Sequence, residues 1–105
     1  VQALMLCEAL RAHYLRLLAE LSDYYFAEQD YTTCVMHAHR LLVSDPCRED
    51  AHRLIMRCYM RQGQRAQALH QYRVCENILR SEFDVAPEAA TLDLFQQLRL
   101  HPDRV

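Results

Sequence analysis

The stretch Tyr59-Met60-Arg61-Gln62-Gly63-Gln64-Arg65-Ala66-Gln67-Ala68 contains the only glycine of the chain, with a helical pattern on each side of it. Glycine readily adopts the left-handed backbone conformation in which many helices end, so Gly63 predicts a helix end. Similar residues stand 34 positions earlier, where Tyr25 corresponds to Tyr59 and the small Cys34 corresponds to the small Ala68. The sequence therefore predicts one helix–turn–helix unit that occurs twice.

A period of 34 residues is typical of tetratricopeptide repeats, in which each unit is a pair of antiparallel helices. One glycine and three prolines leave few places for turns, and no stretch alternates between apolar and polar residues. We therefore predict an all-α, tetratricopeptide-like α-solenoid of about five antiparallel helices with a C-terminal capping helix. The expected helices span residues 2–28, 31–44, 46–62, 64–82 and 88–100, and residues 83–87 form a loop.

Length and charge limit the class of protein. The chain has 105 residues, 51% of them hydrophobic, which suits one domain with a buried core. We take residues 1–105 as a single domain cut from a longer protein, because Val1 already lies inside an amphipathic pattern. The formal net charge is −2, with twelve arginines and no lysine. Domains that bind nucleic acid usually carry an excess of basic residues, so the near-neutral net charge argues against nucleic-acid binding as the main function.

The five cysteines are odd in number and widely spaced, and four of them (Cys7, Cys34, Cys58 and Cys75) fall on the apolar sides of the expected helices. Free cysteine packs as a small hydrophobic residue, so we expect a reduced, cytoplasmic protein. No apolar run approaches the roughly 20 residues that a membrane-spanning helix needs.

Helix starts and inward faces follow from residue type and spacing. Asp30 and Asp45 are expected to cap the second and third helices, with Pro46 in the first turn of the third. The small Cys34 and Ala68 mark the places where two helices approach closely. The residues expected to face inward are Leu4, Cys7, Leu10, Tyr14, Leu17, Leu18, Leu21, Tyr24, Tyr25, Cys34, Val35, Ala38, Leu41, Leu42, Leu54, Ile55, Cys58, Tyr59, Ala68, Leu69, Tyr72, Cys75, Ile78, Leu79, Leu92, Leu94, Phe95 and Leu98.

Two motifs carry a family resemblance. Residues 44–57 read Ser-Asp-Pro-Cys-Arg-Glu-Asp-Ala-His-Arg-Leu-Ile-Met-Arg, and residues 63–72 read Gly-Gln-Arg-Ala-Gln-Ala-Leu-His-Gln-Tyr. With Gln29-Asp30-Tyr31 and the segment from Phe83 to Pro87, they resemble the bacterial transcriptional activator domain over roughly residues 13–99. That domain occurs in regulators of the antibiotic regulatory protein family, typically after a winged-helix DNA-binding domain. The resemblance implies tetratricopeptide-like helix pairs and a role in transcription regulation.

Three positions depart from the family pattern. Gln29 and Asp84 stand where the family commonly has glycine, and Ala89 stands where a second proline is frequent. The first turn must therefore close without glycine. Asp84 suits its position better, because aspartate tolerates the left-handed conformation more readily than most residues.

A stripe of three arginines is the first candidate site. Arg53, Arg57 and Arg61 are spaced i, i+4, i+8, so they share one face of a helix. In a tetratricopeptide register this face lines the concave groove, where arginines can hold the carboxylates of a partner. Alternatively, the stripe is a solvated face with Arg53 paired to Glu49 or Asp50. The complete predicted groove is Arg16, Asp23, Phe26, Arg53, Arg57, Met60 and Arg61.

The N-terminal half of the first helix is the second candidate site. Leu4, Met5, Cys7 and Leu10 have no partner helix within the repeat pattern, and exposed apolar patches usually mark contacts. We predict self-association through these residues, or docking onto a neighbouring domain. The alternative is that the half-helix packs on the helix at 88–100 of the same chain.

The sequence gives little support for a catalytic or a metal-binding site. Cys34, His37 and His39 include zinc-binding residue types, but residues i and i+2 point to different faces of a helix and no fourth ligand is evident. The six histidines are scattered and are expected on helix surfaces. A glycine-rich phosphate loop is impossible with one glycine. We predict no enzyme activity, no metal and no cofactor.

The sequence thus predicts a protein-interaction or oligomerisation domain of a bacterial transcriptional regulator. The expected partner is a protein: an oligomer mate in a homodimer, RNA polymerase or a regulatory segment. DNA would be bound only through a separate domain, and no membrane is involved. Two alternatives remain, a general tetratricopeptide scaffold domain of a multidomain signalling protein and direct nucleic-acid contact by the arginine stripe.

Overall fold

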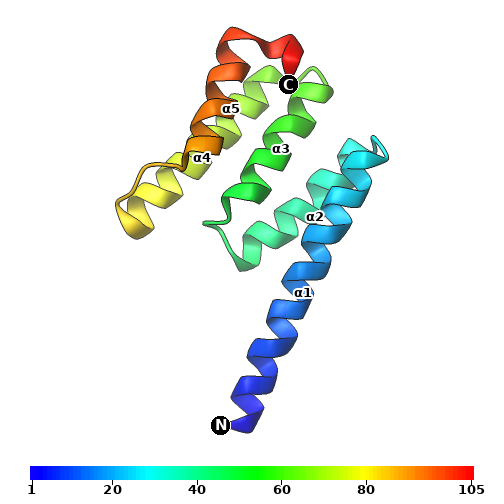
Figure 1. Cartoon of the computed structure of the whole chain (residues 1–105), viewed down its shortest axis with the longest axis vertical. Coiled ribbons are helices and arrows are strands. Elements are labelled where there is room, and N and C mark those ends of the chain that lie inside the picture. Colours follow the sequence, from blue (N-terminus) through cyan, green and yellow to red (C-terminus); the bar gives the residue numbers. More distant parts are fainter.

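The computed structural model describes all 105 residues and contains five α-helices, one short 3₁₀ helix and no strand. The predicted all-α, tetratricopeptide-like solenoid is confirmed, and apart from the start of the third helix each predicted helix boundary lies within one residue of the observed one. Figure 1 shows the helices stacked in chain order, with the N-terminal half of the first projecting beyond the others. The elements are α1 (Gln2–Ala27), α2 (Tyr31–Ser44), α3 (Glu49–Arg61), α4 (Arg65–Phe83), α5 (Ala89–Leu100) and η1 (Pro102–Arg104).

Three helices end through a residue in the left-handed conformation. Gly63, after α3, has a φ of 73°, as its identity predicts. Its counterpart 34 positions earlier, Gln29, has a φ of 63° although it carries a side chain. Asp84, after α4, has a φ of 52°, as expected for a residue that tolerates this conformation. The first turn therefore closes without glycine by holding a glutamine in a strained backbone conformation.

The same hydrogen bonds close both repeat units. The Asp30 N–H donates to the Tyr25 carbonyl at 2.9 Å, and the Gln64 N–H donates to the Tyr59 carbonyl at 2.7 Å. The Asp30 carboxylate also accepts from the Thr33 N–H at 3.2 Å, which confirms Asp30 as the cap of α2. The predicted 34-residue period is thus present in the backbone geometry.

The start of α3 was predicted wrongly. Asp45 does not cap α3, because its N–H donates to the Leu41 carbonyl and so ends α2. Its carbonyl then accepts from the Arg48 N–H at 3.2 Å, which closes a turn. Pro46 occupies the second position of that turn, a position that proline favours, and α3 begins only at Glu49.

Two apolar clusters form the core, and α3 contributes to both. Its neighbouring residues Ile55 and Met56 are both fully buried, and each points into a different cluster. Ala68 is fully buried, as predicted for a close helix approach. The first cluster, from α1, α2 and α3, is Leu15, Leu18, Ala38, Leu41, Leu42, Ala51 and Ile55. The second, from α3, α4 and α5, is Met56, Ala68, Tyr72, Leu94 and Leu98.

The predicted inward face of α1 was largely wrong. Of the residues expected there only Leu18 is fully buried, and Leu15 and Ser22 complete the buried face. Helix α1 carries two apolar faces, and the core takes the one that is turned toward α2 and α3. On other helices, Leu92 also proves exposed. The α1 residues that were predicted inward but are exposed are Leu4, Cys7, Leu10, Tyr14, Leu17, Leu21 and Tyr24.

Candidate functional site

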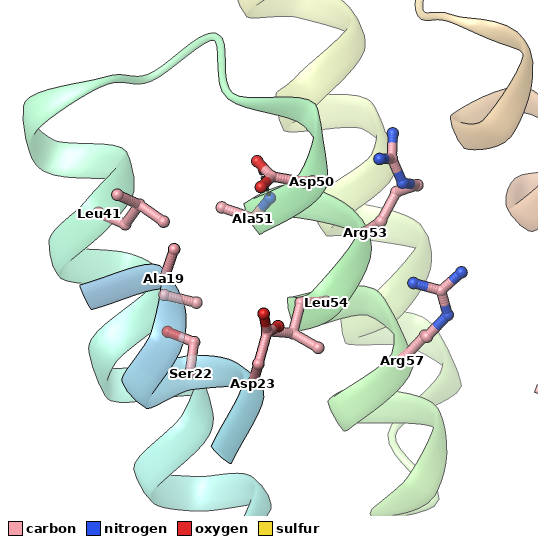
Figure 2. A pocket seen from close by; sticks show the side chains of 10 residues that line it. Ala19, Ser22, Asp23, Leu41, Asp50, Ala51, Arg53, Leu54 and Arg57 are labelled. Atoms are coloured by element: carbon pink, nitrogen blue, oxygen red, sulfur yellow. Dashed lines mark hydrogen bonds between the residues drawn. The ribbon is translucent and has the colours of Figure 1, made fainter. Parts of the chain in front are cut away.

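A cavity of about 210 Å³ lies between α1 and α3. Figure 2 shows Asp23 and Leu54 between these helices, and Arg53 and Arg57 on the side of α3 that faces away from α1. We call this cavity the groove. Its acidic and basic side chains line different parts of it. The lining residues are Ala19, Ser22, Asp23, Ala38, Leu41, Asp50, Ala51, Arg53, Leu54 and Arg57.

Arg57 is the cation of the groove that remains free. It makes no hydrogen bond or ion pair with the rest of the chain, although it is half-buried. Burial, followed by the positive charges of Arg53 and Arg61, lowers the pKa of its guanidinium. An arginine stays charged at neutral pH despite such a shift, so Arg57 carries a poorly compensated positive charge that an anion would stabilise.

Arg53 is already engaged within the chain. It pairs with the Glu88 carboxylate and donates to the Thr91 hydroxyl at 3.0 Å. The suggested pairing of Arg53 with Glu49 or Asp50 is therefore wrong. Glu49 instead accepts from the Glu88 N–H at 2.9 Å and from the Thr91 hydroxyl at 2.8 Å. Since Glu88 and Thr91 stand at the start of α5, this network fastens α5 to α3.

Arg61 is engaged as well. Its guanidinium lies over the Phe26 ring at 5.4 Å from the centroid, and it donates to the Tyr31 hydroxyl at 3.2 Å and to the Val105 carbonyl at 3.0 Å. These contacts connect α3 to α1, α2 and the C-terminal segment. The predicted groove residues Phe26 and Arg61 are thus in contact with each other.

The other predicted groove residues are dispersed. Asp23 lines the cavity and has no hydrogen-bond partner within the chain. Arg16 is exposed on α1 and donates to His13 at 2.9 Å. Met60 is half-buried against the second core cluster. Of the seven predicted groove residues, the cavity therefore brings together Asp23, Arg53 and Arg57.

Sequence reasoning missed Asp50 as a lining residue of the groove. Its carboxylate accepts from the Ala51 N–H at 2.9 Å and from the Arg48 side chain at 2.8 Å. Acidic residues stabilise the first turn of a helix, and that signal was visible in the sequence. Asp50 stands three residues before Arg53 and seven before Arg57, so its helical spacing also placed it on the face of α3 that lines the groove.

The first ten residues of the chain, at the N-terminal end of α1, are all exposed. Leu4, Met5 and Leu10 have exposed fractions of 69%, 66% and 59%, and Cys7 is also exposed. The alternative that this half-helix packs on α5 is therefore wrong. Self-association through these side chains stays a prediction.

One histidine and three cysteines, Cys34, Cys58 and Cys75, are buried in the core. His52 is buried, contrary to the expectation of a surface position, and its Nε2–H donates to the Pro46 carbonyl at 2.8 Å while its Nδ1 accepts from Gln71 at 2.7 Å. Burial lowers the pKa of His52 and raises that of Cys75 to about 12. No three side chains of histidine, cysteine, aspartate or glutamate are arranged to hold a metal ion. None of the helices combines the length and the apolar composition that crossing a bilayer requires.

Comparison with known proteins agrees with this architecture. The model of the bacterial transcriptional activator domain family matches residues 2–99, which is nearly the whole chain. No curated protein and no solved structure gave a significant match. The family match covers both helix pairs and α5, and with them every residue of the groove. The chain therefore belongs to the bacterial transcriptional activator domain family.

Proposed function

We propose that this domain is the protein-interaction part of a bacterial transcriptional regulator, and that its groove binds a carboxylate-bearing segment of a partner protein at Arg57. The family supports a role in transcription regulation. The observation that carries the proposal is the unpaired guanidinium of Arg57, which is half-buried and lies between two other arginines. DNA would be bound by a separate domain of the regulator, and the partner would be RNA polymerase, an oligomer mate or a regulatory segment.

The engaged arginines define what the groove can bind. Because Arg53 and Arg61 already have partners, the groove offers one free cation instead of a stripe of three. One guanidinium binds a carboxylate through two parallel hydrogen bonds. The unpaired Asp23 on α1 then favours a segment that also carries a donor or a basic residue. A nucleic-acid backbone fits this arrangement poorly, since it presents a row of negative charges to Asp23 and Asp50.

The test compares two arginines in the full-length regulator. Arg57→Gln removes the free cation of the groove, whereas Arg73→Gln removes an exposed arginine that also has no partner within the chain but lies outside the groove. Transcription from the target promoter and binding to promoter DNA are measured for each variant. We expect Arg57→Gln alone to lose activation while DNA affinity stays unchanged. Activation equal to that of the unsubstituted regulator would contradict the proposal.

The result also separates the alternatives. Loss of DNA binding in Arg57→Gln, with a dependence on salt concentration that becomes less steep, would favour direct nucleic-acid contact. A general scaffold domain would keep the groove but would have no effect on promoter activity.

A further inference from the structure

The apolar side chains on the exposed face of α1 recur every seven residues. In a heptad labelled a to g, Cys7, Tyr14 and Leu21 occupy position a, and Ala3, Leu10, Leu17 and Tyr24 occupy position d. All seven are exposed, and the exposed fraction is 42% for Leu17 and 53% for Tyr24. We call this set the α1 seam.

The α1 seam is separate from the buried face of the same helix. Leu15, Leu18 and Ser22 point toward α2 and α3, whereas the seam residues lie beside them on the open side of α1. An apolar repeat of seven residues that is kept over three heptads is typical of helices that pair in a coiled coil. A helix packed only against a globular core would not need this second apolar face.

We propose that the α1 seam pairs with the α1 seam of a second copy of this chain, as an antiparallel two-helix coiled coil. The proposal extends the predicted self-association from Leu4, Met5, Cys7 and Leu10 to the whole of α1, and it rests on the interaction function proposed above. Complete covering of the six seam side chains larger than alanine removes at most about 500 Å² per copy, or roughly 1,000 Å² in all. This total lies at the threshold of about 1,000 Å² for a biological interface and below the roughly 1,200–2,000 Å² of stable ones, which is typical of a dimer that forms and dissociates with concentration.

The sizes of the seam residues favour the antiparallel orientation. When Tyr14 faces Leu17 of the second copy, Leu10 faces Leu21 and the small Cys7 faces the large Tyr24. Each of these facing pairs occurs twice in the dimer, because the two copies are related by a two-fold axis. In a parallel pair Tyr14 would face Tyr14 and Cys7 would face Cys7, which crowds some layers and leaves others poorly filled.

Polar side chains beside the seam agree with this orientation. His13 and Glu20 both occupy position g, on the flank of the seam away from α2, and Arg16 donates to His13 from the same side. Antiparallel helices bring g positions together, so Glu20 of each copy meets His13 of the other, whose Nε2–H can donate to the carboxylate. On the opposite flank Arg11 donates to the Ser44 carbonyl at 2.7 Å, which shows that α2 occupies that side. The antiparallel arrangement also sets the projecting half of each α1 against the packed half of the other.

The first test measures the association of the 105-residue chain by analytical ultracentrifugation over a range of concentrations. The unsubstituted chain is expected to form a dimer. Leu17→Glu places a charge in the seam and is expected to raise the dissociation constant at least about tenfold. Leu92→Glu is the matched control, because Leu92 on α5 is exposed to 38% while Leu17 is exposed to 42%. Circular dichroism checks that both variants remain helical.

A chain that stays monomeric at every concentration would overturn the proposal, as would equal effects of Leu17→Glu and Leu92→Glu. Arg57 lies on another face, so Arg57→Gln should leave the dimer intact. A failure of the groove proposal is thereby distinguished from a failure of the α1 seam.

The second test determines orientation by cross-linking. In the Tyr24→Cys variant, an antiparallel pair brings the new thiol beside Cys7 of the second copy, and oxidised glutathione should join them in a covalent dimer. Adding Cys7→Ser should abolish that cross-link. A disulfide between two Cys7 residues in the unsubstituted chain would instead show parallel pairing and would overturn the proposed orientation.

Discussion

The left-handed turn at Gln29 gives the sharpest test of the repeat geometry. A non-glycine residue in this conformation costs about 1–2 kcal/mol, and glycine avoids that cost. Glycine also makes the unfolded chain more flexible, which costs about 0.5–1 kcal/mol. The Gln29 side chain is exposed and makes no hydrogen bond, so nothing else is lost. Gln29→Gly should therefore raise the free energy of unfolding by about 0.5–1 kcal/mol.

The control uses the equivalent position of the second unit. Gly63 has a φ of 73°, and a Cβ added there would meet no atom within 4 Å. Gly63→Gln should therefore lower stability through backbone strain alone, by about the amount that Gln29→Gly raises it. Thermal melts followed by circular dichroism should show opposite shifts of about 2–8 °C. A lower melting temperature for Gln29→Gly, or an unchanged one for Gly63→Gln, would refute the reasoning.

Three further predictions concern packing, the attachment of α5 and pH. Ala68→Leu should overpack the α3–α4 crossing and lower the free energy of unfolding by about 1–3 kcal/mol, and an unchanged thermal melt would contradict the repeat register. Glu49→Ala leaves the Glu88 N–H and the Thr91 hydroxyl without their acceptor, so it should lower the free energy of unfolding by about 1–3 kcal/mol and speed hydrogen exchange in α5. Unchanged exchange would argue against this attachment of α5 to α3. Burial lowers the pKa of His52, so the unfolded chain protonates this imidazole more readily than the folded chain does. The free energy of unfolding should therefore fall as the pH drops below about 6.5, and urea unfolding at about pH 7.5 and pH 5.5 measures the difference.

Much of the fold could be predicted because its signals are local. The single glycine and the cap at Asp30 each act on one turn, and they reappear in the structure as a backbone conformation and a hydrogen bond. The 34-residue period repeats such local signals, and it reappears as the same hydrogen bond in both turns. The start of α3 could not be predicted from local signals. Asp45 and Pro46 suit both a helix start and a turn, and the choice depends on the bond that ends α2.

The candidate site was predicted less completely, because side-chain partners come from distant parts of the chain. The spacing of the arginines identified one helix face, but only the fold reveals that Arg53 pairs with Glu88, thirty-five residues away. The same holds for Arg61 and Val105, and for the buried His52 and Gln71. Helix α1 is a different case: it carries two apolar faces, and the apolar spacing does not say which of them the core buries.

The most direct test of the groove is a titration of the domain with a short blocked peptide of glutamates, followed by the NMR signals of the arginine Nε–H groups. We expect the Arg57 signal to shift with peptide concentration while the Arg73 signal does not, and Arg57→Gln to weaken binding at least about tenfold, as the loss of charge-assisted hydrogen bonds requires. The matching glutamine peptide should produce no shift. Equal shifts of Arg57 and Arg73, or unchanged binding by Arg57→Gln, would contradict the account.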